Sequence, residues 1–501
     1  MSLLDNISNL GTVEQHRPWP RAQVKDEGWH QAIGKLAAGE WSLLGLWADS
    51  PDVHMALLEQ PSADVAVITY TSKSGKYPSV AAHHPPASRL ERAIHDLFGL
   101  EAVGSPDSRP WLDLGFWNVS HPLGKSGPAR KPGPYQLLPA EGEGLHQIPV
   151  GPVHAGIIEP GHFRFTANGE HVVRLEQRLG WVHKGIESLM QGATLEDAAK
   201  FAARTSGDST VAISFAFVQA AEAALQVKVP ARAIYLRALM AELERLANHF
   251  GDIGAICNDA SFSLLHAQCG ILRERTLRAA AAAFGHRLMM DVIVPGGVAR
   301  DLASEGLVQI EALLAEARRV FPQLIELYDN TASLQDRTVT TGIVKPELAR
   351  QFAAGGYVGR ASGRSFDARR TLEYRPYDKL AFDVPVLNAG DVDARVWIRI
   401  REVEQSLSLV EQIVKALPGG ALIAPIGKGK PCEGLGIAEA FRGDVLVWLS
   451  LNSKGRVARC HIRDASWFQW PLLEAAIEGN IVADFPLCNK SFNCSYSGHD
   501  L

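Results

Sequence analysis

Two serines that lie three residues apart, Ser206 and Ser209, occupy a pattern in which cysteines could hold a metal ion. They belong to the segment Arg204-Thr-Ser-Gly-Asp-Ser-Thr210. In a frame such as Arg-x-Cys-Gly-x-Cys, two thiolates at this spacing can bind one soft metal ion from the start of a helix. A serine hydroxyl cannot replace a thiolate for nickel or iron, because its oxygen is hard and is not ionised near neutral pH. The segment therefore has the spacing of a metal site without its ligands, and by itself it is too common to define a function.

Further polar residues complete the set of candidate catalytic groups. Glu159 and His162 lie in the turn Glu-Pro-Gly-His (159–162), and Arg204 and Asp208 flank the two serines. A carboxylate passes protons only if burial raises its pKa toward the working pH, whereas an imidazole titrates near neutrality. His154 and His183 are further candidates, and for any one of the 17 histidines a structural hydrogen bond is the alternative role.

The elements that must position these residues form two modules. Residues 1–121 alternate apolar runs such as DVAVITYTS (64–72) with helical patterns such as SRLERAIHDLFGL (88–100), which predicts a small α/β domain. Residues 122–147 are rich in Pro, Gly and Lys and predict a linker. Residues 148–501 are mostly helical in pattern. The predicted fold class is therefore α+β: an N-terminal α/β domain, then a helical bundle with small peripheral sheets near 150–180 and 436–465.

The sequence of the second module predicts two long helices and one hairpin. Residues 230–250 carry an apolar stripe that includes Leu236, Leu239 and Leu243, and residues 394–417 form another helical pattern. Glu242, Arg245 and His249 share a face of the first helix and must be paired if they are buried. They are either an internal salt-bridge ladder or part of a polar chain that carries protons. Residues 444–464 read as two strands around a turn at 452–455.

Composition narrows the class of protein. The chain has 501 residues, 46% of them hydrophobic, which allows two or more domains with substantial cores. A net charge of −5 leaves no basic surplus to neutralise phosphates, so we expect no nucleic-acid partner. No signal peptide and no membrane-spanning run are predicted. The six cysteines form no Cys-x-x-Cys pair, which argues against an iron–sulfur ligand set in this chain and fits a reducing compartment. They are Cys257, Cys269, Cys432, Cys460, Cys488 and Cys494.

Over some 350 residues the chain resembles a known family. The matching segments, which follow one another in order, are GPVHAGIIEPGHFRF (151–165), GEHVVRLEQRLGWVHKGIESLM (169–190), AIYLRALMAELERLANHFGDIGAI (233–256), VPGGVARDL (294–302), FDVPVLNAGDVDAR (382–395), GIAEAFRGDV (436–445) and ADFPLCNKSFNCSYSGHDL (483–501). They resemble the large subunit of membrane-bound, energy-converting (group 4, formate-hydrogenlyase-type) [NiFe] hydrogenases and the 49-kDa-type subunit of respiratory complex I. Residues 90–112 are similar to the 30-kDa-type subunit, which is often fused ahead of it.

The resemblance implies where the site lies and what it has lost. Hydrogenases of this family complete a four-thiolate nickel site with a second Cys-x-x-Cys near the C-terminus, and the place we match to it reads Cys488-Asn-Lys-Ser491. One thiol of four then survives, so we expect no nickel–iron centre and no metal. Residues 483–501 should return to the Arg204 loop. The resemblance also places the Glu159–His162 turn at the edge of the active-site cavity, in a loop where a glutamate of metal-bearing relatives passes protons. The hydroxyls of Ser206 and Ser209, with Cys488 and Ser491, would line a cavity that suits a quinone headgroup.

The resemblance also implies a complex and a role in it. We expect a redox-coupling subunit of an NAD(P)H- or formate-linked quinone oxidoreductase-like complex, peripheral on the cytoplasmic side of the cell membrane, which couples electron transfer to ion translocation. Its implied partners are a 20-kDa-like small subunit with a 4Fe–4S cluster, a ferredoxin-like electron-transfer subunit and membrane antiporter-like subunits. NAD binding is a property of the family only, because no Gly-x-Gly-x-x-Gly fingerprint is present. A scaffold with a vestigial site is the alternative, and a hydrogen-evolving hydrogenase is opposed by the missing thiols.

Overall fold

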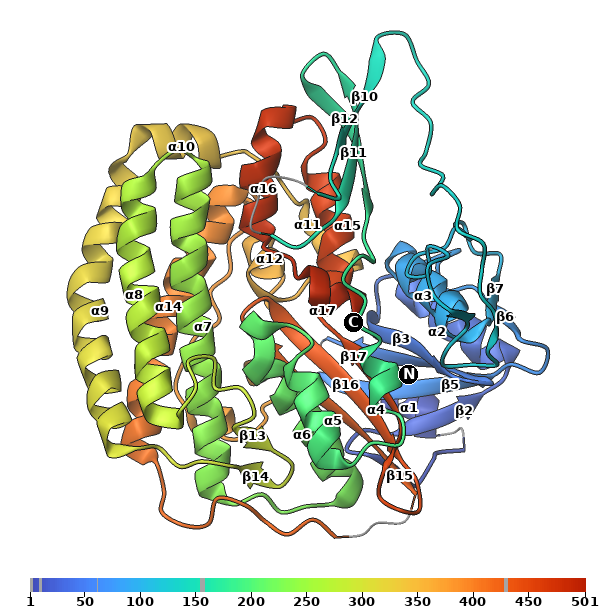
Figure 1. Cartoon of the computed structure of the whole chain (residues 1–501), viewed down its shortest axis with the longest axis horizontal. Coiled ribbons are helices and arrows are strands. Elements are labelled where there is room, and N and C mark those ends of the chain that lie inside the picture. Colours follow the sequence, from blue (N-terminus) through green and yellow to red (C-terminus); the bar gives the residue numbers. More distant parts are fainter. Residues whose placement is uncertain (1–2, 9–10, 61, 154–157, 428–430) are drawn as a thin grey trace.

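The computed structural model describes residues 3–8, 11–60, 62–153, 158–427 and 431–501, and its N-terminal part is a four-stranded sheet with three helices (Figure 1). The strand order is β2-β5-β4-β3, with β2 parallel to β5 and the other neighbours antiparallel. The strand predicted at 64–72 and the helix predicted at 88–100 are both present. The elements are α1 (Leu3–Ser8), β2 (Arg21–Val24), α2 (Asp26–Ala37), β3 (Ser42–Asp49), β4 (Asp52–Glu59), β5 (Asp64–Thr71), β6 (Lys76–Pro78), α3 (Ser88–Phe98) and β7 (Glu101–Val103).

This sheet is buried on both faces, which explains why its strands are almost continuously apolar. Helices α2 and α3 pack on one face. The other face packs against a second sheet, β1-β15-β16-β17, and the rings of Trp47 and Trp448 meet there with their centroids 5.7 Å apart. The second sheet contains the predicted hairpin and consists of β1 (His16–Arg17), β15 (Cys432–Ala440), β16 (Gly443–Leu451) and β17 (Val457–Arg463).

Four long helices form the bundle that occupies the left half of Figure 1. They are α7 (Ala231–Asp259), α8 (Ser263–Phe284), α9 (Ser304–Asn330) and α14 (Val392–Ala416), so the helices predicted at 230–250 and 394–417 are confirmed. The apolar stripe of α7 is fully buried. Helix α6 (Thr210–Leu225) lies between the bundle and β15. A Cβ atom at Gly434 of β15 would lie 1.8 Å from the Ala220 carbonyl oxygen of α6, so glycine permits this close approach.

A three-stranded antiparallel sheet, β10-β11-β12, projects from the top of the molecule in Figure 1. Below it, the C-terminal helices return into the interior between the bundle and the N-terminal domain. The remaining elements are β8 (Val119–Ser120), β9 (Gly127–Pro128), β10 (Leu145–Val150), β11 (His162–Asn168), β12 (His171–Arg178), α4 (Ile186–Met190), α5 (Leu195–Ala203), β13 (Ile293–Val294), β14 (Gly297–Val298), α10 (Ala332–Thr338), α11 (Pro346–Gln351), α12 (Gly356–Ala361), α13 (Ala368–Thr371), α15 (Ser466–Ala476), α16 (Phe485–Phe492) and α17 (Tyr496–Asp500).

The modules predicted from sequence share one core. The apolar cluster of the N-terminal domain also contains Phe163, Trp470 and Phe492 from the second module. The stretch predicted as a linker, 122–147, includes β9 and the first residues of β10, and has no regular secondary structure between them. Within the described residues, no helix has the length and apolar character needed to cross a membrane.

Candidate functional site

A polar cavity of about 380 Å³ lies where the tail of the chain meets the Arg204 loop. Three other segments contribute to its wall: the turn that holds Glu159, the end of α7 with Asp259, and the β15–β16 turn with Arg442. From the tail, Lys490 and Tyr496 line it. The predicted return of residues 483–501 to the Arg204 loop is therefore what the structure shows.

A chain of hydrogen bonds joins the tail to the serine pair. The amide of Gly498 donates to Ser495 Oγ at 2.8 Å, and Ser495 Oγ lies 2.9 Å from Ser206 Oγ. Ser206 Oγ in turn donates to Asp208 Oδ1 at 2.8 Å, and Ser209 Oγ donates to the same oxygen at 3.2 Å. Because the protons of both predicted serines are directed at Asp208, their remaining lone pairs can only accept hydrogen bonds.

Asp208 is held as a carboxylate by Arg442. The two guanidinium nitrogens lie 2.9 Å and 2.5 Å from the two carboxylate oxygens. Burial would raise the pKa of Asp208, but the charge and hydrogen bonds of Arg442 outweigh it and hold the pKa at about 2. Asp208 therefore orients hydroxyls and balances a buried guanidinium, and it is ionised at neutral pH. Arg442 lies in the GIAEAFRGDV segment (436–445), and its position in the sequence did not indicate that it would pair with Asp208.

Two of the four candidate catalytic residues reach the cavity wall, and two do not. Glu159 lines it and accepts from the Ser497 amide at 3.0 Å. Arg204 points to the surface, where it forms a two-pronged ion pair with Asp291. His162 lies on β11, with Nδ1 3.0 Å from the Gly151 carbonyl and Nε2 accepting from Arg164. Both nitrogens of His162 are thus engaged inside the hairpin region.

The tail residues matched to the second Cys-x-x-Cys do not face the serine pair. Cys488 is fully buried against Gly342, and burial raises the pKa of its thiol to about 11. Ser491 accepts from Arg395 Nε at 2.9 Å. Both belong to α16, whereas the residue that meets Ser206 is Ser495, just before α17. The stretch with three-residue spacing beside Ser206 is therefore Ser495-Tyr-Ser-Gly498, which carries no thiol at either end.

The residues around this cavity do not fit a nickel–iron centre. Of the lining residues that the structure describes, Cys494 alone has a thiol, and burial raises the pKa of that thiol well above its ordinary value. In the described ranges, no group of three or more His, Cys, Asp or Glu side chains could hold a metal ion. Hydroxyls, a carboxylate paired with arginine and one protonated thiol cannot supply four thiolates.

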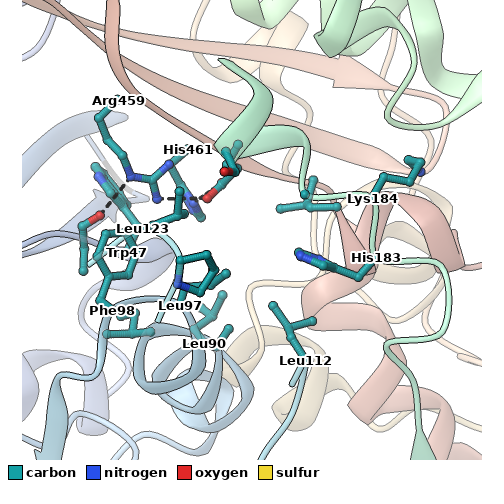
Figure 2. A pocket seen from close by; sticks show the side chains of 18 of the residues that line it. Trp47, Leu90, Leu97, Phe98, Leu112, Leu123, His183, Lys184, Arg459 and His461 are labelled. Atoms are coloured by element: carbon teal, nitrogen blue, oxygen red, sulfur yellow. Dashed lines mark hydrogen bonds and ion pairs between the residues drawn. The ribbon is translucent and has the colours of Figure 1, made fainter. Parts of the chain in front are cut away.

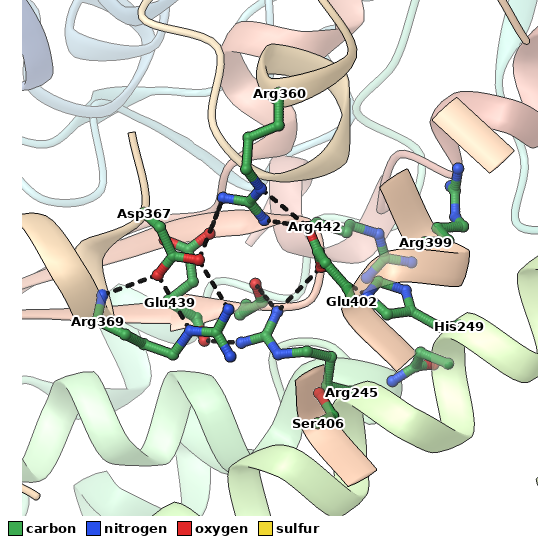
Figure 3. A network of polar contacts seen from close by, with 12 residues as sticks. Arg245, His249, Arg360, Asp367, Arg369, Arg399, Glu402, Ser406, Glu439 and Arg442 are labelled. Atoms are coloured by element: carbon green, nitrogen blue, oxygen red, sulfur yellow. Dashed lines mark hydrogen bonds and ion pairs between the residues drawn. The ribbon is translucent and has the colours of Figure 1, made fainter. Parts of the chain in front are cut away.

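Behind the cavity, buried charged side chains from α7, α12, α13, α14 and β15 form a network (Figure 3). Arg360 is its centre, because its guanidinium bonds the carboxylates of Glu402 at 2.7 Å and Glu439 at 2.9 Å. Glu242, Arg245 and His249 of α7, which share a face as predicted, all belong to it. Glu242 pairs with Arg369 and with Arg245, and Glu402 pairs with His249 and, at 3.8 Å, with Arg245. Each of the three α7 side chains has an oppositely charged partner in this network. The interpretation as an internal salt-bridge ladder therefore accounts for them.

A second cavity, of about 300 Å³, lies between the N-terminal domain and the second module (Figure 2). Its walls are mainly apolar side chains of α3 and β3, with His183 and Lys184 on one side. The ring of His183 stacks on Trp117, with centroids 4.7 Å apart, and Lys184 Nζ donates to the Thr205 carbonyl at 3.1 Å. This cavity thus adjoins the Arg204 loop from the other side. Its titratable groups include Glu187 and His461, which are paired with each other at 3.0 Å, and most of its wall is apolar. The polar cavity, which includes Ser206, is therefore the better candidate for redox chemistry. His154, another candidate histidine of the sequence, lies outside the described residues.

The fold defines a class by architecture: a large helix-rich domain with small sheets, joined to a small α/β domain, with a polar cavity at the Arg204 loop. Family models agree with this division. The model for the respiratory-chain NADH dehydrogenase 30 kDa subunit matches residues 24–133, the 49 kDa subunit model matches 263–433, and the nickel-dependent hydrogenase model matches 184–251.

Relatives place the chain within a family. Formate hydrogenlyase subunit 5 of Escherichia coli is 32% identical over 437 residues, which cover 85% of this chain and 77% of the relative. A D-type subunit of the NADH-quinone oxidoreductase of Roseiflexus sp. is 32% identical over 352 residues, or 68% of this chain and 94% of the relative. The chain belongs to this family of complex I-type and group 4 hydrogenase-type large subunits. A solved membrane-bound sulfane sulfur reductase, an archaeal respiratory membrane complex, has the same fold, with a TM-score of 0.68 at 23% identity over 72% of this chain and 99% of that chain.

Proposed function

We propose that this chain is the redox-coupling subunit of a membrane-associated oxidoreductase complex and that its polar cavity reduces a quinone headgroup without a nickel–iron centre. The observation that carries the proposal is the cavity itself. It is open, about 380 Å³ in volume, and lined by polar groups in place of the thiolates that a metal would need. A scaffold with a vestigial site would more readily have a cavity filled by apolar side chains.

The cavity wall offers the groups that a quinone requires. Lys490 and Tyr496 can donate hydrogen bonds to carbonyl oxygens, and Glu159 is a carboxyl within the same space. Reduction of a quinone to a quinol takes two electrons and two protons. The electrons would come from a 4Fe–4S cluster in a neighbouring 20-kDa-like small subunit, because this chain has no Cys-x-x-Cys pair to hold one. Asp208, with a pKa of about 2, is an orienting group and not the stored source of a proton.

The wider setting is part of the proposal. The printed names of relatives include a formate hydrogenlyase and NADH-quinone oxidoreductases. By that likeness we infer a peripheral position on the cytoplasmic side of the membrane. A ferredoxin-like subunit would supply electrons, and antiporter-like membrane subunits would move the coupled ions.

Quinone-dependent turnover of the purified complex tests the proposal. Reduced viologen serves as the electron donor and menadione as the acceptor. Tyr496→Phe removes a hydroxyl from the cavity wall, and Tyr135→Phe, remote from this cavity, is the matched control. We expect turnover in the native complex and a fall of roughly tenfold in Tyr496→Phe only. If the native complex assembles but reduces neither menadione nor a longer-tailed quinone, the proposal is wrong and the chain is a scaffold with a vestigial site.

A further inference from the structure

Glu244 is a buried carboxyl on α7 that lies behind the serine turn and forms no ion pair with any described residue. Its oxygens accept hydrogen bonds from the amides of Val211, at 2.7 Å, and Ala212, at 3.1 Å. These amides belong to the first turn of α6, directly after Asp208 and Ser209. Glu242, on another face of the same helix, is by contrast bonded by Arg369. A buried carboxyl that is held only by backbone amides can gain and lose a proton without breaking a salt bridge.

A small cavity connects Glu244 to the outside. Its volume is about 30 Å³, roughly the share of one water molecule in the liquid. Arg273 and Arg287, which are exposed, line it together with Asn248 and Glu244. Asp208 lines both this small cavity and the candidate quinone cavity.

The side-chain amide of Asn248 ties the main chain at Asp208 to the main chain at Glu244. Asn248 Nδ2 donates to the main-chain carbonyl of Asp208 at 2.8 Å and to that of Glu244 at 2.9 Å. The loop that carries the serines is therefore tied to the helix that carries Glu244. Glu244 and Asp208 both line the small cavity, and Asp208 also lines the candidate cavity, so the two cavities meet at Asp208.

We propose that Glu244 is the proton-carrying residue of the candidate site: it takes protons from solvent through the small cavity and delivers them past Asp208 to the bound quinone. The inference rests on the proposed function. For each quinone reduced to quinol, two electrons arrive from the partner subunit and two protons are consumed. Glu244 gives up one proton toward the quinone and is reprotonated from bulk solvent, and this cycle runs twice for each quinol formed.

The acidities permit this direction of transfer. Burial raises the pKa of Glu244 to about 8, so it holds a proton at neutral pH. Arg442 keeps Asp208 ionised, so Asp208 accepts a proton only transiently and the proton ends on the reduced quinone.

Glu91 provides a matched control, because it has the same chemistry in another place. It is also a buried carboxyl that accepts hydrogen bonds from two consecutive amides, those of Val80 and Ala81 at 2.6 Å and 3.2 Å. It lies in the N-terminal domain and lines neither of the two cavities around Asp208. Glu244→Gln and Glu91→Gln both keep an oxygen that can accept from the backbone and both remove an ionisable proton.

Menadione turnover of the assembled complex, measured across pH, is the first arm of the test. We expect Glu244→Gln to lower turnover roughly tenfold or more and to remove an ionisation near pH 8, while Glu91→Gln changes neither. If the complex with Glu244→Gln reduces menadione at the native rate and with the native pH profile, the inference is overturned and the proposed function still stands. If Glu244→Gln does not assemble, Ala280→Val narrows the small cavity without touching the carboxyl, and an unchanged rate then overturns the inference.

Infrared titration of the complex without quinone is the second arm, and it does not depend on turnover. We expect the carbonyl stretch of a protonated carboxyl that disappears near pH 8, shifts promptly in heavy water and is missing in Glu244→Gln. If the native complex does not reduce quinone, the proposed function fails and this band alone decides whether Glu244 exchanges protons with solvent. Its absence overturns the inference.

Discussion

The hydroxyl oxygens of Ser206 and Ser495 lie 2.9 Å apart although 289 residues separate them in the chain. This contact forms part of the wall of the candidate cavity, because it joins the loop before α6 to the tail before α17. Ser206 Oγ donates its hydrogen bond to Asp208 Oδ1, so Ser495 is the donor between the two hydroxyls. The Asp208 carboxylate thereby sets the donor-to-acceptor direction of the whole chain of hydrogen bonds. Arg442 in turn holds Asp208 in its ionised form.

Breaking the Asp208–Arg442 pair should destabilise the protein more than breaking the surface pair at the other end of the same loop. Asp208→Asn leaves the buried Arg442 guanidinium without its counter-charge, which we expect to cost about 2–3 kcal/mol, below the range for fully buried pairs because the Asp208 side chain is 37% exposed. Arg204→Ala breaks the exposed pair with Asp291 and should cost less than about 1 kcal/mol. Chemical denaturation of the two variants in the same complex measures the difference. Equal losses would mean that Asp208 is not what compensates Arg442.

Stability should fall in acid through the carboxylates whose pKa values are depressed. Glu187 is buried; burial opposes its ionisation, but Arg459 and His461 hold its pKa at about 2, the same value as for Asp208. A carboxylate with a folded-state pKa below its unfolded value stabilises the fold above the unfolded pKa of about 4. That contribution is lost as the pH falls from about 4 to about 2. Glu187→Gln should flatten the fall in unfolding free energy across this window, and an unchanged slope would contradict the assignment.

Purified complex should contain no nickel at this subunit. The four positions with the required spacing around the cavity are Ser206, Ser209, Ser495 and Gly498, and none has a thiol. Elemental analysis is the measurement, and about one nickel per chain together with hydrogen uptake would refute the expectation. Ser206→Cys with Ser209→Cys should not create hydrogenase activity, since the two tail positions remain without ligands.

Expressed alone, the subunit should be poorly soluble and should recover when its small subunit is co-expressed. Several large apolar side chains are exposed, among them Phe116 at 77%, Val153 at 90% and Trp181 at 38%. Obligate interfaces commonly bury more than about 2,000 Å², and such surfaces aggregate when they lack their partner. Size-exclusion chromatography after single and joint expression gives the comparison. A monodisperse monomer with one sharp unfolding transition would contradict the expectation.

Local pattern was enough to predict the elements but not the shared core. The apolar stripe around Leu239 and the alternation at 64–72 predicted α7 and β5, because a helix face or a strand must be buried to form. The boundary at 121 was inferred from composition, yet Phe163 and Trp470 pack into the core of the N-terminal domain. Composition shows where the local sequence changes along the chain. It does not show which apolar faces pack against each other in the folded protein.

The sequence by itself determined the family, the order of the segments and the absence of a thiolate set, because these follow from residue identity and spacing. The tertiary structure alone decided which residues of the tail meet Ser206. Cys488 and Ser491 sit on α16 with their side chains turned to Gly342 and Arg395, whereas Ser495 follows the αL residue Asn493 that ends this helix and redirects the chain. It likewise decided that Arg442 faces Asp208 while Arg204 faces solvent. Contacts between residues more than 200 positions apart depend on how helices and sheets pack together, and spacing along the chain does not encode that geometry.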